Sequence, residues 1–188
     1  MLSSLALAAP DSRPLGPYTV SFDLNSDMNY RIDIREPVTS EVGDAYQMAI
    51  VKDNSTLAVI GITEYKEPTD STLLVHKNLV PMNMVLREGL NVTNVEDKTV
   101  DEKDGFLVTA VPFAADGAQP DFDVYRAMYW LDSENCECGP VSVGQTSVMV
   151  SSTYPQDATQ SLLSSLHVEK GQAAATATES MPPAQMPK

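Results

Sequence analysis

Large apolar residues alternate with polar ones in two short segments near the start of the chain. In YTVSFDL, residues 18–24, every second residue is apolar, and YRIDIRE, residues 30–36, repeats the pattern. A period of two indicates strands with one buried face. Asn25, Ser26, Asp27 and Asn29 favour a turn between them. We therefore predict two half-buried strands.

Further apolar segments come in pairs that indicate β-hairpins, because turn-forming residues separate the two members of each pair. The first pair is joined by Asp53 and Asn54, the second by Asp101–Gly105, and the third by the loop that contains both cysteines. The paired segments are 45–53 with 55–65, 92–100 with 105–113, and 122–132 with 140–154.

Two segments have helical rather than strand periodicity. In residues 70–90, Asp70 or Ser71 is a suitable N-terminal cap and Gly89 a suitable end. Pro81 lies inside this segment, so it must kink the helix or split it. In residues 155–168, Asp157 stands near the start. The apolar residues of this second helix share one side: Ala158, Leu162, Leu163 and Leu166.

The order of these elements is strands, a helix, more strands and a final helix. This order predicts an α+β fold, an antiparallel β-sheet with two helices packed on it. Residues 1–16 contain two prolines and no periodic pattern, which favours a leader or flexible arm. Residues 171–188 are rich in alanine, threonine and proline, which is typical of a flexible tail. We therefore predict a single domain over residues 17–170.

Two stretches resemble the PsbP-like α/β/α sandwich family. They are VEDKTVDEKDGFLVTAV, residues 95–111, and SVMVSSTYPQDATQSLLSSLHV, residues 147–168. The resemblance rests on the pattern and order of elements over about residues 17–170. It implies an exported or lumenal accessory protein that binds partners, with no catalytic residues common to the family. Pro81 and the cysteine loop have no counterpart in this pattern.

The charge balance excludes some classes of partner. The chain has 26 acidic and 12 basic residues and a formal net charge of -14. Nucleic acids and anionic membrane surfaces need clustered lysine and arginine, so neither is an expected partner. No apolar run reaches the roughly 18 residues that span a bilayer. The charge instead fits an extracytoplasmic protein or one that binds cations.

The N-terminus adds to the prediction of export. MLSSLALAAP is small and apolar, and Ala6-Leu7-Ala8 has the form of a signal-peptidase site. We interpret residues 1–9 as the remnant of a secretion signal, with an ordinary N-terminus as the alternative. The sequons at Asn54 and Asn91 are compatible with glycosylation of an exported protein.

The only two cysteines, Cys136 and Cys138, are separated by one residue. Residues two apart on an extended chain are about 6.6 Å apart, at the far limit of disulfide geometry. An internal disulfide therefore needs a bent loop. Free thiols, disulfides to another chain and half of a metal site are the alternatives, and the last would recruit His76 and His167 or a second chain.

Other chemistry has weak support in the sequence. Neither histidine belongs to a recognisable hydrolase or nucleotide-binding motif. Acidic residues gather in 96–104, 116–123 and 132–137, but none of these stretches has the spacing of a twelve-residue calcium loop. We therefore expect no catalytic site, no cofactor and no metal, with calcium as the alternative.

The aromatic residues Tyr125, Tyr129 and Trp130 lie in one predicted strand. Tyr125 and Tyr129 share a face with Ala127, whereas Trp130 shares the other face with Met128. We expect at least one face in the core, and an exposed second face would form a surface for a partner.

These observations predict an exported, non-catalytic accessory domain that engages a protein partner or ligand through its sheet surface. The alternative is a cell-surface structural protein, a subunit of a layer, sheath or filament, that self-associates by strand pairing or disulfides.

Overall fold

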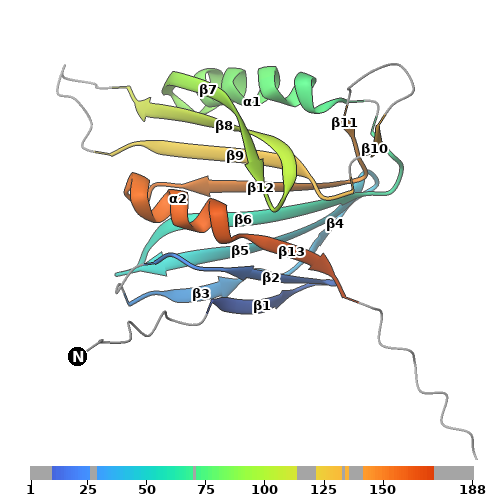
Figure 1. Cartoon of the computed structure of the whole chain (residues 1–188), viewed down its shortest axis with the longest axis horizontal. Coiled ribbons are helices and arrows are strands. Elements are labelled where there is room, and N and C mark those ends of the chain that lie inside the picture. Colours follow the sequence, from blue (N-terminus) through green and yellow to red (C-terminus); the bar gives the residue numbers. More distant parts are fainter. Residues whose placement is uncertain are drawn as a thin grey trace, which may run out of the picture.

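The structure, a computed structural model, describes residues 10–25, 29–69, 71–113, 122–132, 134–135 and 142–171. Its elements are arranged in layers, with two helices on a large sheet and a small sheet beside one of them (Figure 1). The helices are α1 (Leu73–Glu88) and α2 (Gln156–Ser165). The strands are β1 (Asp11–Leu15), β2 (Tyr18–Phe22), β3 (Arg31–Ile34), β4 (Val38–Thr39), β5 (Gly43–Lys52), β6 (Ser55–Tyr65), β7 (Leu90–Val100), β8 (Lys103–Pro112), β9 (Val124–Trp130), β10 (Glu134–Asn135), β11 (Ser142–Val143), β12 (Thr146–Ser152) and β13 (His167–Lys170).

The large sheet is antiparallel and has the order β3-β5-β6-β12-β9-β8-β7, with β4 also paired to β5. The three predicted hairpin pairs are adjacent strands in it, namely β5 with β6, β7 with β8, and β9 with β12. The α+β class with an antiparallel sheet and two helices is therefore confirmed.

The small sheet has the order β1-β2-β13 and holds one of the two alternating segments. Tyr18, Val20 and Phe22 of β2 are buried, as their alternation predicts. The second alternating segment forms β3, at the edge of the large sheet. Sequence alternation therefore identified both strands, but it did not show that they belong to different sheets.

The predicted domain boundary at residue 17 is wrong, because β1 pairs with β2 through a turn at Gly16 and Pro17. The prolines in this segment led to the incorrect prediction of a flexible arm. Pro14 is inside β1, where an edge strand tolerates a residue that cannot donate a backbone hydrogen bond. Residues 1–9 and 172–188 lie outside the described part, so the predicted secretion signal and tail stay predictions.

Two hairpins turn through pairs of residues with positive φ angles. Asp53 and Asn54 have φ of 49° and 65°, and Asp101 and Glu102 have φ of 53° and 59°. Two-residue turns of this kind match the twist of the flanking strands. Gly105, predicted as part of the second turn, instead lies within β8. A Cβ atom there would be 2.6 Å from the carbonyl oxygen of Met128, so close strand packing requires glycine.

Helix α1 begins after Thr72, whose side chain accepts a hydrogen bond from the amide of Val75 at 3.2 Å. The predicted cap at Asp70 or Ser71 is therefore wrong by one or two residues. Gly89 ends the helix with φ of 67°, as predicted. Pro81 lies inside α1 without dividing it into two helices.

Removal of the cap at Thr72 tests the start of α1. Thr72→Ala is expected to lower the free energy of unfolding by about 1 kcal/mol, because the amide of Val75 loses its acceptor. Urea unfolding measures the change, and Ser71→Ala is the control because Ser71 is not the cap. Equal effects of the two substitutions would contradict the assignment.

The core has two parts, one on each face of the large sheet. On one face, α2 and the small sheet cover a cluster that includes Phe22, Ile60 and Leu162. On the other face, α1 covers a cluster that includes Met84, Phe106 and Trp130. Figure 1 shows α2 and β13 together across the sheet, with α1 beside β7 and β8. The ends of the small sheet and of α2 thus border the strand ends of the large sheet.

Candidate functional site

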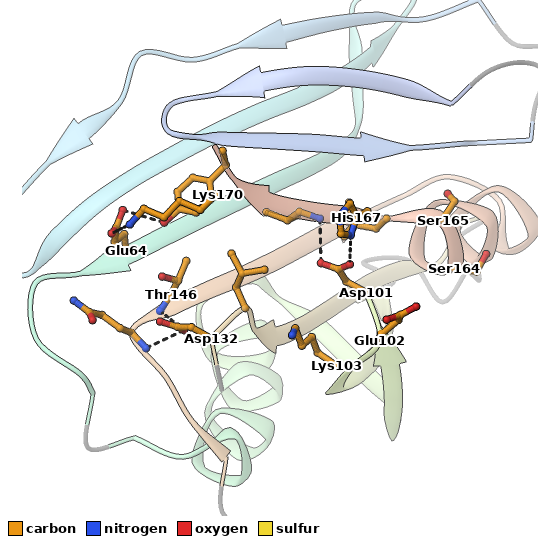
Figure 2. A pocket seen from close by; sticks show the side chains of 15 residues that line it. Glu64, Asp101, Glu102, Lys103, Asp132, Thr146, Ser164, Ser165, His167 and Lys170 are labelled. Carbon is orange, nitrogen blue, oxygen red and sulfur yellow. Dashed lines mark hydrogen bonds and ion pairs between the residues drawn. The ribbon is translucent and has the colours of Figure 1, made fainter. Parts of the chain in front are cut away.

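A polar recess of about 720 Å³ lies where the small sheet and α2 meet the ends of the large sheet (Figure 2). Its walls come from β13, the C-terminal end of α2, the β7–β8 turn, and the residues that flank β9 and β12. The volume is within the range of ligand pockets in proteins. The lining includes four carboxylates, two lysines and one histidine: Glu64, Asp101, Glu102, Asp132, Lys103, Lys170 and His167.

One end of the recess is closed by an ion pair between the two sheets. Lys170 of β13 binds Glu64 of β6, and the hydroxyl of Tyr18 donates to the same carboxylate at 2.9 Å. The ammonium of Lys170 also lies 5.9 Å from the centre of the Tyr18 ring. Burial, chiefly, and the neighbouring carboxylate raise the pKa of Tyr18, so its phenol stays a donor.

Glu64 makes the stability of this junction depend on pH. Its hydrogen bond to Lys170 is the largest cause that lowers the pKa of Glu64 below its ordinary value of 4.5, and burial opposes the shift. A lowered pKa in the folded state stabilises the protein above pH 4.5, and this contribution is lost as the pH falls through the folded-state value.

We expect Glu64→Gln to be less stable than the wild type at pH 7, with a difference that shrinks as the pH falls below about 4.5. Glutamine keeps the shape and an acceptor oxygen, but it carries no charge. Urea unfolding between pH 7 and pH 3 measures the difference. A difference that stays constant with pH would contradict a lowered pKa at Glu64.

The second junction between the sheets is built on Asp101, whose side chain is only 5% exposed. One carboxylate oxygen accepts hydrogen bonds from the hydroxyl of Tyr129 at 3.1 Å and the amide of Val168 at 3.0 Å. The other is 2.7 Å from Nδ1 of His167. Burial raises the pKa of Tyr129, so its phenol remains a donor. Figure 2 shows the Asp101 carboxylate pointing from the β7–β8 turn toward His167.

The remaining polar groups decide what the recess can do chemically. Asp101 with His167 has the form of a carboxylate that orients a base. Two serines line the same recess, but their hydroxyls already form hydrogen bonds within α2 and with the backbone of Asp23. Ser165 accepts from the amide of Asp23 at 2.8 Å and donates to the carbonyl of Ser161 at 2.7 Å, and Ser164 also donates to Ser161. In this geometry, neither serine is therefore positioned as a nucleophile that His167 activates.

Asp132 also has a structural contribution at the rim. One oxygen of its carboxylate accepts from the amides of Gln145 and Thr146, at 3.1 and 2.8 Å. Glu102 is exposed at the tip of the β7–β8 turn, next to Lys103. The lining is therefore acidic overall, since its four carboxylates outnumber its two lysines. Two of these carboxylates, Glu64 and Asp101, already have a lysine or histidine partner.

The two histidines lie on opposite faces of the large sheet. His167 borders the polar recess, whereas His76 of α1 packs edge-on against Trp130 with ring centres 5.4 Å apart. Burial lowers the pKa of His76. His76 and His167 therefore do not meet to complete a metal site with the cysteines. Within the described residues, no three histidine, cysteine or acidic side chains are grouped as metal ligands.

The predicted partner surface at Tyr125, Tyr129 and Trp130 is wrong as an exposed patch. Tyr125 is 5% exposed, and the other two are completely buried. The predicted division of faces is correct, because Tyr125 and Tyr129 belong to the cluster under α2 and Trp130 to the cluster under α1. Sequence alternation could not show that both faces of this central strand are covered.

The other predicted sites have different outcomes. Asn54 is exposed in the β5–β6 turn, where its side chain accepts from Arg31 at 3.3 Å. Asn91 is exposed on β7, the edge strand of the large sheet. Glycosylation of either stays a prediction. Cys136 and Cys138 lie outside the described residues, so their pairing also stays open.

A smaller groove lies on the α1 side of the large sheet, where His76 of α1 forms part of its wall. It has a volume of about 230 Å³, and its lining combines small polar and apolar residues, among them Gly61, Ser147 and Met149. A Cβ atom at Gly61 would make only ordinary contacts, the nearest at 3.9 Å. This groove has no charged residue in its lining and is the second candidate site.

Local patterns in the sequence do not identify the residues that build the polar recess. Tyr18, Glu64 and Lys170 are separated by more than forty residues along the chain in each case. Asp101 and Glu102 were noted only as turn acids. The one available signal was the acidic, two-residue turn itself, because a side chain at positive φ can point away from its own hairpin.

Comparison with protein-family models, with curated proteins and with solved structures finds no match to this chain. Of the helices in the described residues, neither is long and apolar enough to cross a membrane.

Proposed function

We propose that the protein is an exported, non-catalytic accessory domain that binds a ligand or a protein partner in the polar recess between the large sheet and the small sheet β1-β2-β13. We further propose that its fold is a PsbP-like α/β/α sandwich, on the basis of the order of elements and the two stretches described above. The observation that carries the proposal is that the side chains of the recess form hydrogen bonds between elements of the fold. Asp101 and Glu64 join the two sheets, and Ser165 joins α2 to the backbone of Asp23, which leaves a stable polar cavity rather than an activated nucleophile.

The charge of the lining favours a cationic group on the ligand or partner. Lys170 and His167 are partners of Glu64 and Asp101, and Lys103 offsets only one of the two remaining carboxylates, Glu102 and Asp132, so the open rim keeps a negative charge. The formal net charge of -14 adds a long-range field of the same sign, which attracts cations to the protein. A primary ammonium, as in a lysine side chain or a polyamine, is the simplest group that fits.

The proposal is tested by nuclear magnetic resonance titration of the full chain with spermidine and a lysine-rich peptide, and with glutarate as the anionic control. The cationic probes are expected to shift the amide resonances of recess residues, whereas glutarate shifts none. Glu102→Asn is expected to weaken binding by about fivefold, the effect of one exposed charge. Asparagine tolerates the positive φ at this position.

Two matched variants locate the binding. Glu36→Gln removes one acidic charge outside the recess lining and is expected to leave binding unchanged. Gly61→Phe fills the second groove and is also expected to leave it unchanged. Loss of binding only in Gly61→Phe would assign the ligand to that groove instead. Titrations in which no cationic probe shifts the recess resonances would overturn the proposal.

A further inference from the structure

Helix α1 is apolar on two opposite sides, but the residues that the structure describes cover only one of them. Val80 and Met84 of α1 are buried against the large sheet. On the outer side, six large apolar side chains are between 39% and 73% exposed: Leu74, Val75, Leu79, Met82, Val85 and Leu86. A helix that is hydrophobic all round is normally buried on all sides. The outer face of α1 therefore has the composition of an interface.

The spacing on this outer face suits another helix. Val75, Leu79, Met82 and Leu86 follow one another at steps of four, three and four residues, and together we name them the α1 stripe. This is the spacing of the apolar seam between two packed helices. Phe113, which is 60% exposed, lies next to the C-terminal end of α1, where its amide donates to the carbonyl of Gly89.

The stripe is complementary to itself in an antiparallel arrangement. Val75 and Leu86 are equally far from its midpoint, and so are Leu79 and Met82. A two-fold axis through this midpoint would pack Val75 on Leu86 of the second copy and Leu79 on its Met82. Every apolar residue of the stripe then meets an apolar residue, as an isologous interface requires.

Charge also favours this surface, over the other surfaces of the protein, as the place where a second copy of the chain binds. Two copies that each carry a net charge of -14 repel one another over most of their surfaces. Residues 71–95 contain only one acidic residue, Glu88, and its carboxylate forms two hydrogen bonds with Arg126 at 2.6 and 2.9 Å. Lys77 of α1 is likewise paired, with Asp97 at 2.7 Å. The α1 face is therefore where two acidic chains can approach.

We propose that the α1 stripe is the interface of a two-fold symmetric homodimer in which the two α1 helices pack antiparallel. The four residues of the stripe and Phe113 are few compared with the roughly 20–30 residues on each side of a standard interface, so the dimer is weak and concentration-dependent. This association is independent of the cysteines and of the polar recess.

Sedimentation of the full chain with reductant present tests the proposal, from about 1 µM to about 1 mM, the range in which weak interfaces associate. The average mass is expected to rise from 20.4 kDa, the mass of one chain, toward twice that value. Leu79→Glu and Met82→Lys are each expected to remain monomeric. Val38→Glu, at another exposed valine, is the matched control and is expected to dimerise as the wild type does.

A mixture of the two stripe variants distinguishes this geometry from other contacts. Because Leu79 faces Met82 of the second copy, an equal mixture of Leu79→Glu and Met82→Lys is expected to recover a heterodimer. Circular dichroism of each variant checks that it is folded, and Val85→Lys replaces any that is not. Wild-type protein that stays monomeric throughout, or dimers that persist in both stripe variants, would overturn the proposal. So would binding of the stripe to phosphatidylcholine vesicles without dimerisation.

Discussion

Asp101→Ala is expected to lower the free energy of unfolding by about 3–5 kcal/mol, because two buried donors lose their acceptor and alanine takes a strained backbone conformation. The hydroxyl of Tyr129 and the amide of Val168 both donate to this carboxylate. Tyr129 is completely buried, so water cannot replace the lost acceptor. Urea unfolding at pH 7 with linear extrapolation measures the change.

Two controls separate the hydrogen bonds from other effects of this substitution. Asp101→Asn keeps an acceptor oxygen and tolerates the positive φ, so it is expected to cost less than half as much. Asp104→Ala removes an exposed carboxylate from the same hairpin and is expected to change stability by less than about 0.5 kcal/mol. A loss below about 1 kcal/mol in Asp101→Ala would show that Asp101 does not hold the two sheets together.

Trp130→Ala is expected to destabilise the fold by about 3–5 kcal/mol, through lost contacts and the cavity left behind. The Trp130 ring is completely buried, edge-on to His76 and 6.1 Å from the ring centre of Tyr65. Trp130 is the only tryptophan, so its fluorescence reports this site alone. The emission of the native protein is expected at shorter wavelength than that of the unfolded chain.

The matched control is Phe113→Ala, which removes an aromatic ring that is 60% exposed. This substitution is expected to cost less than about 1 kcal/mol. Trp130→Phe keeps an aromatic ring and removes an indole nitrogen that has no hydrogen-bond partner among the described residues, so it is expected to cost much less than Trp130→Ala. If Trp130→Ala left stability unchanged and instead reduced the binding of a partner, the assignment of this side chain to the core would be wrong.

The hairpins show where local sequence was sufficient. Asp53-Asn54 and the acidic pair at Asp101 and Glu102 are short turns between strong strand patterns, and each hairpin has the predicted partner strands. Alternation along β9 also placed Tyr129 and Trp130 on opposite faces, as in the structure. These features depend on residues close together in sequence, so periodicity and turn chemistry contain the necessary information.

The candidate site shows where local sequence was not sufficient. Tyr18, Glu64 and Lys170 come together only because β2 and β13 pair in the small sheet and this sheet packs over β6. No periodic pattern encodes a contact between side chains on separate sheets. The same limit explains β1, whose prolines look like a flexible arm until β2 is present to pair with it.

The sequence by itself determined the class of the fold, the paired strands, the two helices and the acidic character of the surface, because each depends on local periodicity or on composition. Only the tertiary structure decided which faces are covered. It buried Tyr125, Tyr129 and Trp130, left the outer side of α1 exposed, and joined distant charges around one polar recess. Burial is a property of packed layers, so it follows from the long-range arrangement of elements rather than from any single segment.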